Sequence, residues 1–293
     1  PAAFADWTLT FSDEINGPAG SQPAAPWVLK NERWYPNQEL QVYTNRPDNV
    51  FLDGQGHLVL RAKEEVYTIN GKTGSYTSGR IATGDYEQPS GFSQQYGKWE
   101  ARIKAPVGNG LVSSWWTVGE GEYWPKNGEI DIVELVGRYL DKYFPGIHAA
   151  KLDGSHWTLG KTITKPNVLA GWHTYTMVWT PGQIVLSMDA TDPTQGWVLK
   201  KENFLLPRVW PFDDRPHRAI LCLSVGGTFG GAPDGTTVFP ADFLVDYVRV
   251  YTDNAVTPPP PPPAAPNPRQ TAREGLIAGR ALTAEEADVT VNP

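Results

Sequence analysis

Three carboxylic acids, Glu129, Asp131 and Glu134, stand close together inside an apolar, β-branched stretch of the chain. In a β-strand, residues i and i+2 share a face, so Glu129 and Asp131 point the same way. Regular alternation would turn Glu134 to the other face. A β-bulge at Ile132 and Val133 would add one residue and restore the shared face, and bulges are common beside active sites.

Three acids on one face serve stability poorly, because like charges raise one another's pKa and burying unpaired carboxylates is costly. A polar edge strand with solvated acids is the plainer interpretation, but the flanking Ile, Val and Leu and the upstream Trp124 and Pro125 disfavour it. The arrangement suits cleavage of a glycosidic bond, which needs one carboxylate as nucleophile and one carboxylic acid as proton donor.

The composition limits the possible partners. The formal net charge of the 293 residues is −7 with no basic block, which argues against nucleic acid and anionic membranes. No run of about 18 apolar residues predicts a membrane span. Trp and Tyr number 12 each, and we expect most of them in the core and some on sugar rings. Cys222 is the single cysteine and is expected to be a buried apolar filler without a disulfide.

Strand patterns dominate the first 255 residues, and no long segment there repeats its apolar residues every 3.6 positions. Alternating or β-branched runs bounded by Gly, Pro, Asn and Asp predict strands at 57–62, 97–104, 174–179, 184–189 and 243–251. Many short strands with frequent turns predict a sandwich or jelly roll.

The composition changes sharply near Thr257. We predict a catalytic domain at 1–255, a stiff proline-rich linker at 256–268 and a short, possibly helical tail at 269–293. Such a spacer is associated with secreted or cell-wall glycan hydrolases, and this is the localisation that we expect. Nothing in the sequence indicates an oligomer, so a monomer is expected.

Further motifs accompany the acids. They are Trp-Pro at 124–125, a terminal Val-Asp-Tyr-Val-Arg-Val-Tyr strand, and segments 11–14, 37–43, 78–81, 96–104 and 224–227. Through these motifs, residues 6–252 closely resemble glycoside hydrolase family 16, in its laminarinase-like, endo-β-1,3-glucanase branch. The resemblance implies an all-β fold, a β-jelly roll sandwich of two curved antiparallel sheets with a concave cleft.

The resemblance makes Glu129 the nucleophile and Glu134 the general acid/base, with Asp131 between them. Asp131 could hydrogen-bond Glu129 and keep negative charge near Glu134, which would help Glu134 to hold its proton near neutral pH. Carboxyl groups ~5–5.5 Å apart would give a retaining double displacement. No cofactor is expected for catalysis.

The same resemblance implies a set of substrate-binding residues: Asn37, Arg80, Trp116, Trp124, His148 and Phe229. Each also has a structural alternative, such as a core position for Trp124, a surface ion pair for Arg80 or a turn role for Asn37. Because Trp115 and Trp116 are adjacent, one is expected to face the cleft and the other the core.

A structural Ca²⁺ ion is also implied on the convex side. Glu14, the carbonyl of Gly56 and Asp246 stand at the family's ligand positions, and oxygen ligands of this kind suit Ca²⁺. Solvated charges are the alternative.

The sequence departs from the family at several positions. Cys222 replaces an Asn, Phe229 replaces a Trp, and the segments 112–117 and 138–145 are unusual. The bond-breaking acids are intact, so we predict an endo-acting, retaining hydrolase of β-1,3-glucan of the laminarin type. The alternatives are a transglycosylase, a hydrolase of mixed-linkage glucan or galactan, and a non-catalytic lectin-like module.

Overall fold

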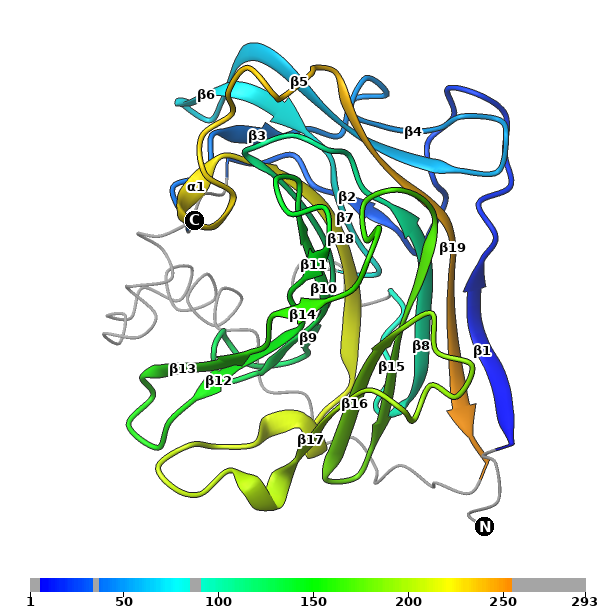
Figure 1. Cartoon of the computed structure of the whole chain (residues 1–293), viewed down its shortest axis with the longest axis vertical. Coiled ribbons are helices and arrows are strands. Elements are labelled where there is room, and N and C mark those ends of the chain that lie inside the picture. The colour runs from blue at the N-terminus through cyan, green and yellow to red at the C-terminus, as the bar shows by residue number, and fades with distance from the viewer. Residues whose placement is uncertain (1–5, 34–36, 85–90, 255–293) are drawn as a thin grey trace, which may run out of the picture.

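The structure is a computed structural model, and it describes residues 6–33, 37–84 and 91–254. Two curved sheets lie face to face over most of this region (Figure 1). Within the described residues, α-helix is confined to α1 (Gly227–Gly230), with 3-10 turns at η1 (Lys201–Asn203) and η2 (Pro211–Asp213). None of the helices described is long and apolar enough to cross a membrane.

Ten strands form the larger sheet, in the order β17-β16-β15-β8-β19-β5-β6-β3, with β1 on β19 and β4 on β5. Their bounds are β1 Trp7–Asp13, β3 Gln41–Tyr43, β4 Val50–Leu52, β5 Leu58–Ile69, β6 Lys72–Ser78, β8 Gly97–Lys104, β15 His173–Thr180, β16 Gln183–Met188, β17 Trp197–Lys200 and β19 Ala241–Asp253.

Seven strands form the second sheet, in the order β13-β12-β10-β9-β18-β7-β2. Their bounds are β2 Val28–Leu29, β7 Arg80–Ala82, β9 Leu111–Gly119, β10 Glu129–Val136, β12 Gly146–Ala150, β13 His156–Gly160 and β18 His217–Val225. A separate two-stranded ladder joins β11 (Lys142–Tyr143) to β14 (Ile163–Thr164). Strands β9, β10 and β18 curve together, which leaves one face of this sheet concave (Figure 1).

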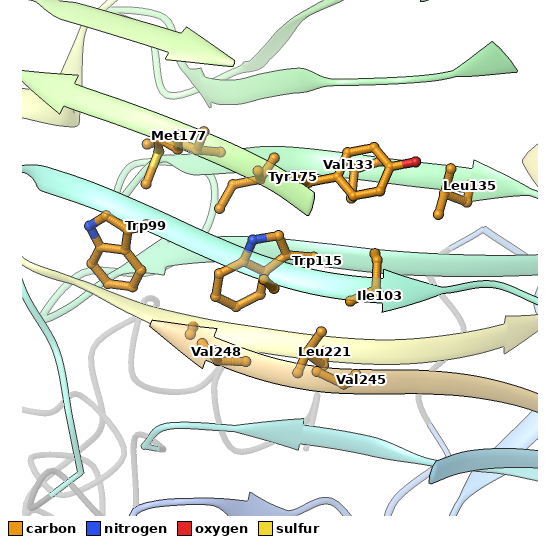
Figure 2. Packing of buried hydrophobic residues seen from close by; sticks show 14 of the residues in the cluster. Trp99, Ile103, Trp115, Val133, Leu135, Tyr175, Met177, Leu221, Val245 and Val248 are labelled. Atoms are coloured by element: carbon orange, nitrogen blue, oxygen red, sulfur yellow. The ribbon is translucent and has the colours of Figure 1, made fainter. Parts of the chain in front are cut away.

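The core fills the space between the two sheets (Figure 2). Trp99 and Tyr175 of the larger sheet and Trp115 of the smaller sheet are fully buried there. Residues of β8 alternate between buried and half-buried up to Ile103 and end at the exposed Lys104, as expected for a strand with one face on a core. Each such large side chain contributes about 1.5–3 kcal/mol by leaving water.

The structure confirms the predicted fold class. All five predicted strand segments are present, as β5, β8, β15, β16 and β19. One pairing differs from an all-antiparallel sandwich, because β3 runs parallel to β6. Strands β4 and β5 lie between β3 and β6 in the sequence. After them, β6 runs alongside β3 in the same direction. The predicted linker and tail lie outside the described residues.

Candidate active site

The predicted β-bulge lies in the middle of β10. Against β9, Asp131 pairs with Trp116 and Val133 pairs with Trp115, so Ile132 is the extra residue. Ile132 and Val133 both pack into the core between the sheets. The bulge therefore returns Glu134 to the face that carries Glu129 and Asp131.

That face has a floor of its own. Tyr43, Ala82, Trp116, Val118, Ile220 and Cys222 form a second apolar cluster, separate from the main core. Trp116 lies in this floor and Trp115 in the core, as the sequence predicts for adjacent strand residues. Cys222 is a buried free cysteine, as predicted, although it packs in the floor and not between the sheets.

The three acids converge on this concave face. One carboxylate oxygen of Glu129, one of Asp131 and one ring nitrogen of His148 all lie within 4.8 Å of one another. Depressions of about 460 Å³ beside Arg61 and about 380 Å³ beside Trp197 contain none of the acids.

Glu129 and Glu134 both bind protons more tightly than an ordinary glutamate. Burial, followed by the charge of Asp131, raises the pKa of Glu129 to about 8. Burial, followed by the charges of Asp131 and Glu129, holds the pKa of Glu134 well above 4.5. With these groups so close, the first ionisation opposes the next.

Two contacts favour the ionised form of Glu129. The indole Nε1–H of Trp124 donates to Oε2 of Glu129 at 2.6 Å, and both Trp124 and His148 act to lower the pKa of Glu129. For Glu134, Asp131, Glu129 and Glu39 act to raise the pKa and His148 acts to lower it. The Trp124 N–H therefore distinguishes the two glutamates, because it stabilises a carboxylate on Glu129.

His148 lies directly across β10, paired with Glu129 on β12. Its Nε2 is 3.1 Å from Oδ2 of Asp131, which makes an ion pair when His148 is protonated. Burial acts to lower the pKa of His148, but Asp131 and the two glutamates outweigh it and raise that pKa to about 9. His148 therefore carries positive charge among the three acids at neutral pH.

Trp124 and Arg80 both lie on the concave face that carries the acids. The Trp124 side chain is 47% exposed above Glu129, so its ring can stack on a sugar. The Arg80 guanidinium is 5.3 Å from the ring centre of Trp116 and 3.3 Å from Oε1 of Glu32. Across the floor, Arg80 pairs with Cys222, which pairs with Ser114, the partner of Glu134.

Comparison with known proteins follows this geometry. Residues 37–215 match Glycosyl hydrolases family 16. The chain belongs to this family.

Individual relatives support the assignment of this family 16 glycosidase. It is 33% identical to "Beta-glucanase" of Rhodothermus marinus over 84% of this chain and 85% of that protein. It is 29% identical to "Glucan endo-1,3-beta-glucosidase A1" of Niallia circulans over 86% of this chain, but spans only 39% of that longer protein. The laminarinase catalytic domain of Thermotoga petrophila RKU-1 superposes with a TM-score of 0.73 at 30% identity, covering 86% of this chain and 100% of that one.

Asn37 and Phe229 lie together at one edge of the enzyme's concave face. The backbone carbonyl of Asn37 accepts the N–H of Thr228 at 2.8 Å, which joins segment 37–39 to α1. The Asn37 side-chain amide donates to Glu39 at 3.1 Å. The half-buried ring of Phe229 meets Phe144 edge to face at 5.3 Å.

Sequence reasoning missed three residues of this site: Glu39, Phe144 and His156. Phe144 exchanges both backbone hydrogen bonds with Glu134, so the two side chains share a face. It lies in segment 138–145, whose unusual sequence was the available signal. Glu39 is a carboxylate with only 8% exposure inside a recognised motif, and His156 contacts His148 edge to edge.

The calcium prediction does not fit the structure. Both carboxylates of the expected set already hold arginines: Glu14 makes a two-pronged ion pair with Arg249 at 2.7 and 2.8 Å, and Asp246 pairs with Arg102. Arg249 lowers the pKa of Glu14. A guanidinium at each carboxylate occupies the oxygen atoms and the charge that a calcium ion would need, and the carbonyl of Gly56 alone is too weak a ligand set.

Proposed function

We propose that this enzyme is an endo-acting, retaining hydrolase of β-1,3-linked glucan. The observation that carries the proposal is the bulge at Ile132, which places Glu129 and Glu134 on one concave face with Asp131 between them. Relatives named as a β-glucanase, an endo-1,3-β-glucosidase and a laminarinase support this class of substrate.

The first chemical step forms a glycosyl-enzyme. An oxygen of the Glu129 carboxylate attacks the anomeric carbon, and the bond from that carbon to the leaving oxygen breaks. Glu134 gives its proton to that oxygen, so the departing sugar leaves as a neutral alcohol.

The second step reverses these roles. Glu134, now a carboxylate, takes a proton from water as the water oxygen attacks the anomeric carbon, and Glu129 departs. Two inversions at one carbon leave its configuration unchanged. The positive charge of His148 beside Asp131 limits the accumulation of negative charge around Glu129 during this cycle.

Hydrolysis of purified polysaccharides tests this proposal. We expect reducing ends to appear on laminarin with a spread of oligosaccharide sizes, and Glu129→Gln to lower the rate at least ~10³-fold. Glu202→Gln, an exposed glutamate on η1, is the matched control. Higher activity on mixed-linkage glucan or galactan than on laminarin would identify that polysaccharide as the substrate instead. Longer products in the presence of added acceptor sugars would show that the enzyme is a transglycosylase. Binding without cleavage would refute an enzymatic role on glucan.

We further propose that the enzyme is a monomer that works outside the cell or at its wall. The proline-rich segment at 256–268 and the polymeric substrate class support this setting. Enzyme activity confined to the cytosolic fraction of its host, or a dimer mass by light scattering, would overturn the respective statement.

A further inference from the structure

Two histidine rings meet edge to edge beside the catalytic acids. His148 on β12 and His156 on β13 lie on the same face of a β-hairpin, with His156 paired to Ala150, two residues beyond His148. Their ring planes are 2° from parallel with centroids 5.1 Å apart. Nδ1 of His148 is 2.9 Å from Nε2 of His156.

The positions of the protons follow from the neighbours of each ring. Nε2 of His148 faces the Asp131 carboxylate, so it carries a hydrogen. Asp131 also raises the pKa of His148 to about 9, which places a second hydrogen on Nδ1 at neutral pH. Nδ1–H of His148 therefore donates to His156, whose Nε2 must be unprotonated to accept it.

His156 also contacts the indole that serves Glu129. The ring centre of Trp124 is 4.7 Å from His156 and 6.3 Å from His148. Trp124 is otherwise half exposed, and its Nε1–H is aimed at Glu129. The imidazole of His156 is thus in contact with both groups that touch the acids.

We propose that His156 is a positioning residue for the catalytic acids, acting in its neutral form. It accepts the Nδ1–H of His148 and so holds the imidazolium against Asp131. Its ring also backs Trp124, which keeps the indole N–H on the nucleophile Glu129. The inference rests on the proposed function.

The charges around His156 make this arrangement sensitive to acid. Burial, followed by the charges of His148 on β12 and Lys151 in the hairpin turn, lowers the pKa of His156 below 6.5. Asp131 and Glu129 on β10 lie beyond His148. Protonation of His156 would remove the acceptor and set two cationic rings in contact, with nitrogens 2.9 Å apart, so the hydrogen bond between the rings should break as the pH falls.

Two substitutions separate the acceptor from the ring. His156→Gln keeps an acceptor but cannot titrate, whereas His156→Phe keeps a stacking ring without an acceptor. The matched control is His57→Gln, because His57 also stacks on a tryptophan, Trp172 at 4.8 Å, and pairs with a carboxylate, Asp53, away from the site.

We expect His156→Phe to lower kcat about tenfold with little change in KM. His156→Gln should keep kcat within about threefold and shift the acid limb of its pH profile to lower pH. The His57→Gln control should match wild type. Equal activity of wild type and His156→Phe, or an equal loss in both His156 variants, would overturn the proposal.

A substrate-free measurement keeps this test separate from the proposed function. The chain has five histidines, so the imidazole ¹⁵N signals can be followed through a pH titration. We expect the pKa of His148 to fall in His156→Phe and to stay near the wild-type value in His156→Gln. An unchanged His148 pKa in both variants would refute the inference, whatever polysaccharide the enzyme cleaves.

Discussion

Glu129 and Glu134 are identical side chains on one strand, and we propose that their neighbours give them different roles. Glu129 accepts the Trp124 N–H, whereas Asp131, Glu129 and Glu39 raise the pKa of Glu134. Burial raises the pKa of both, so the proposed division depends on these neighbours and not on exposure. Catalytic acids and bases are commonly separated in this way.

The raised pKa of Glu134 has a consequence for stability. A folded-state pKa above the unfolded value means that the folded protein binds the proton more tightly. This stabilisation is complete below about pH 4.5 and is lost as the pH rises through the raised pKa. We therefore expect Glu134→Gln to increase the free energy of unfolding at pH 8, and to change it little at pH 4.

Urea unfolding at the two pH values measures this difference. Glu202→Gln is the control, because its carboxyl group is exposed and should leave stability unchanged at both. A Glu134→Gln variant less stable than wild type at pH 8 would show that the acid is not held protonated by the fold.

At this scale the sequence predicts the acids well and their partners poorly. The three acids can be recognised in the sequence because they interrupt an otherwise apolar strand. Pairing between strands brings three further residues to the site, namely His156, Phe144 and Glu39. Local residue patterns do not show which strands pair, so these residues could not be predicted. The same limit applies to the calcium prediction, since the arginines that pair with Glu14 and Asp246 lie on other parts of the chain.

Among the elements, β10 and the segment after it set the shape of the site. The bulge in β10 was predictable, because only an extra residue brings three acids at positions i, i+2 and i+5 to one face. The position of α1 was not predictable. Arg138 holds it by donating to the carbonyls of Phe229, at 3.0 Å, and of Gly230.

This tether leads to an expectation for Arg138→Ala. Without the two hydrogen bonds, α1 and the Phe229 ring should loosen while the acids stay in place. We expect KM for the polysaccharide to rise about three- to tenfold with kcat nearly unchanged. Steady-state kinetics on the preferred glucan measures both constants.

Lys142→Ala is the control for this variant. Lys142 lies over the same Tyr139 ring as Arg138, at 5.2 Å and 4.8 Å respectively, so both changes remove a cation from that ring. Equal KM values for the two variants would mean that the hydrogen bonds to α1 do not position the substrate-binding edge.

For the whole molecule, two packed sheets leave one concave face to carry function. Strand segments and the fold class were predictable because alternation reports which residues face a core. Sheet order and the parallel β3–β6 pair were not, since they depend on how distant strands meet. The packing also joins the first and last strands that the structure describes, since β1 lies on β19 with the Glu14–Arg249 pair beside them.

These arginine pairs lead to an expectation about metal removal. Because Arg249 and Arg102 already neutralise Glu14 and Asp246, the fold has no need of Ca²⁺ at that position. We expect the Tm to change by less than about 1 °C between EDTA and added Ca²⁺. A fall of more than about 3 °C in EDTA that Ca²⁺ reverses would restore the calcium site.

The most direct test of the central claim is the anomeric configuration of the first product. If two carboxyl groups on one face cooperate, each cleavage inverts the anomeric carbon twice. Proton NMR during the first minutes of laminarin hydrolysis should show the β-anomer of the new reducing end before mutarotation. An α-anomer formed first would mean a single displacement by water, and would contradict the role given to Glu129.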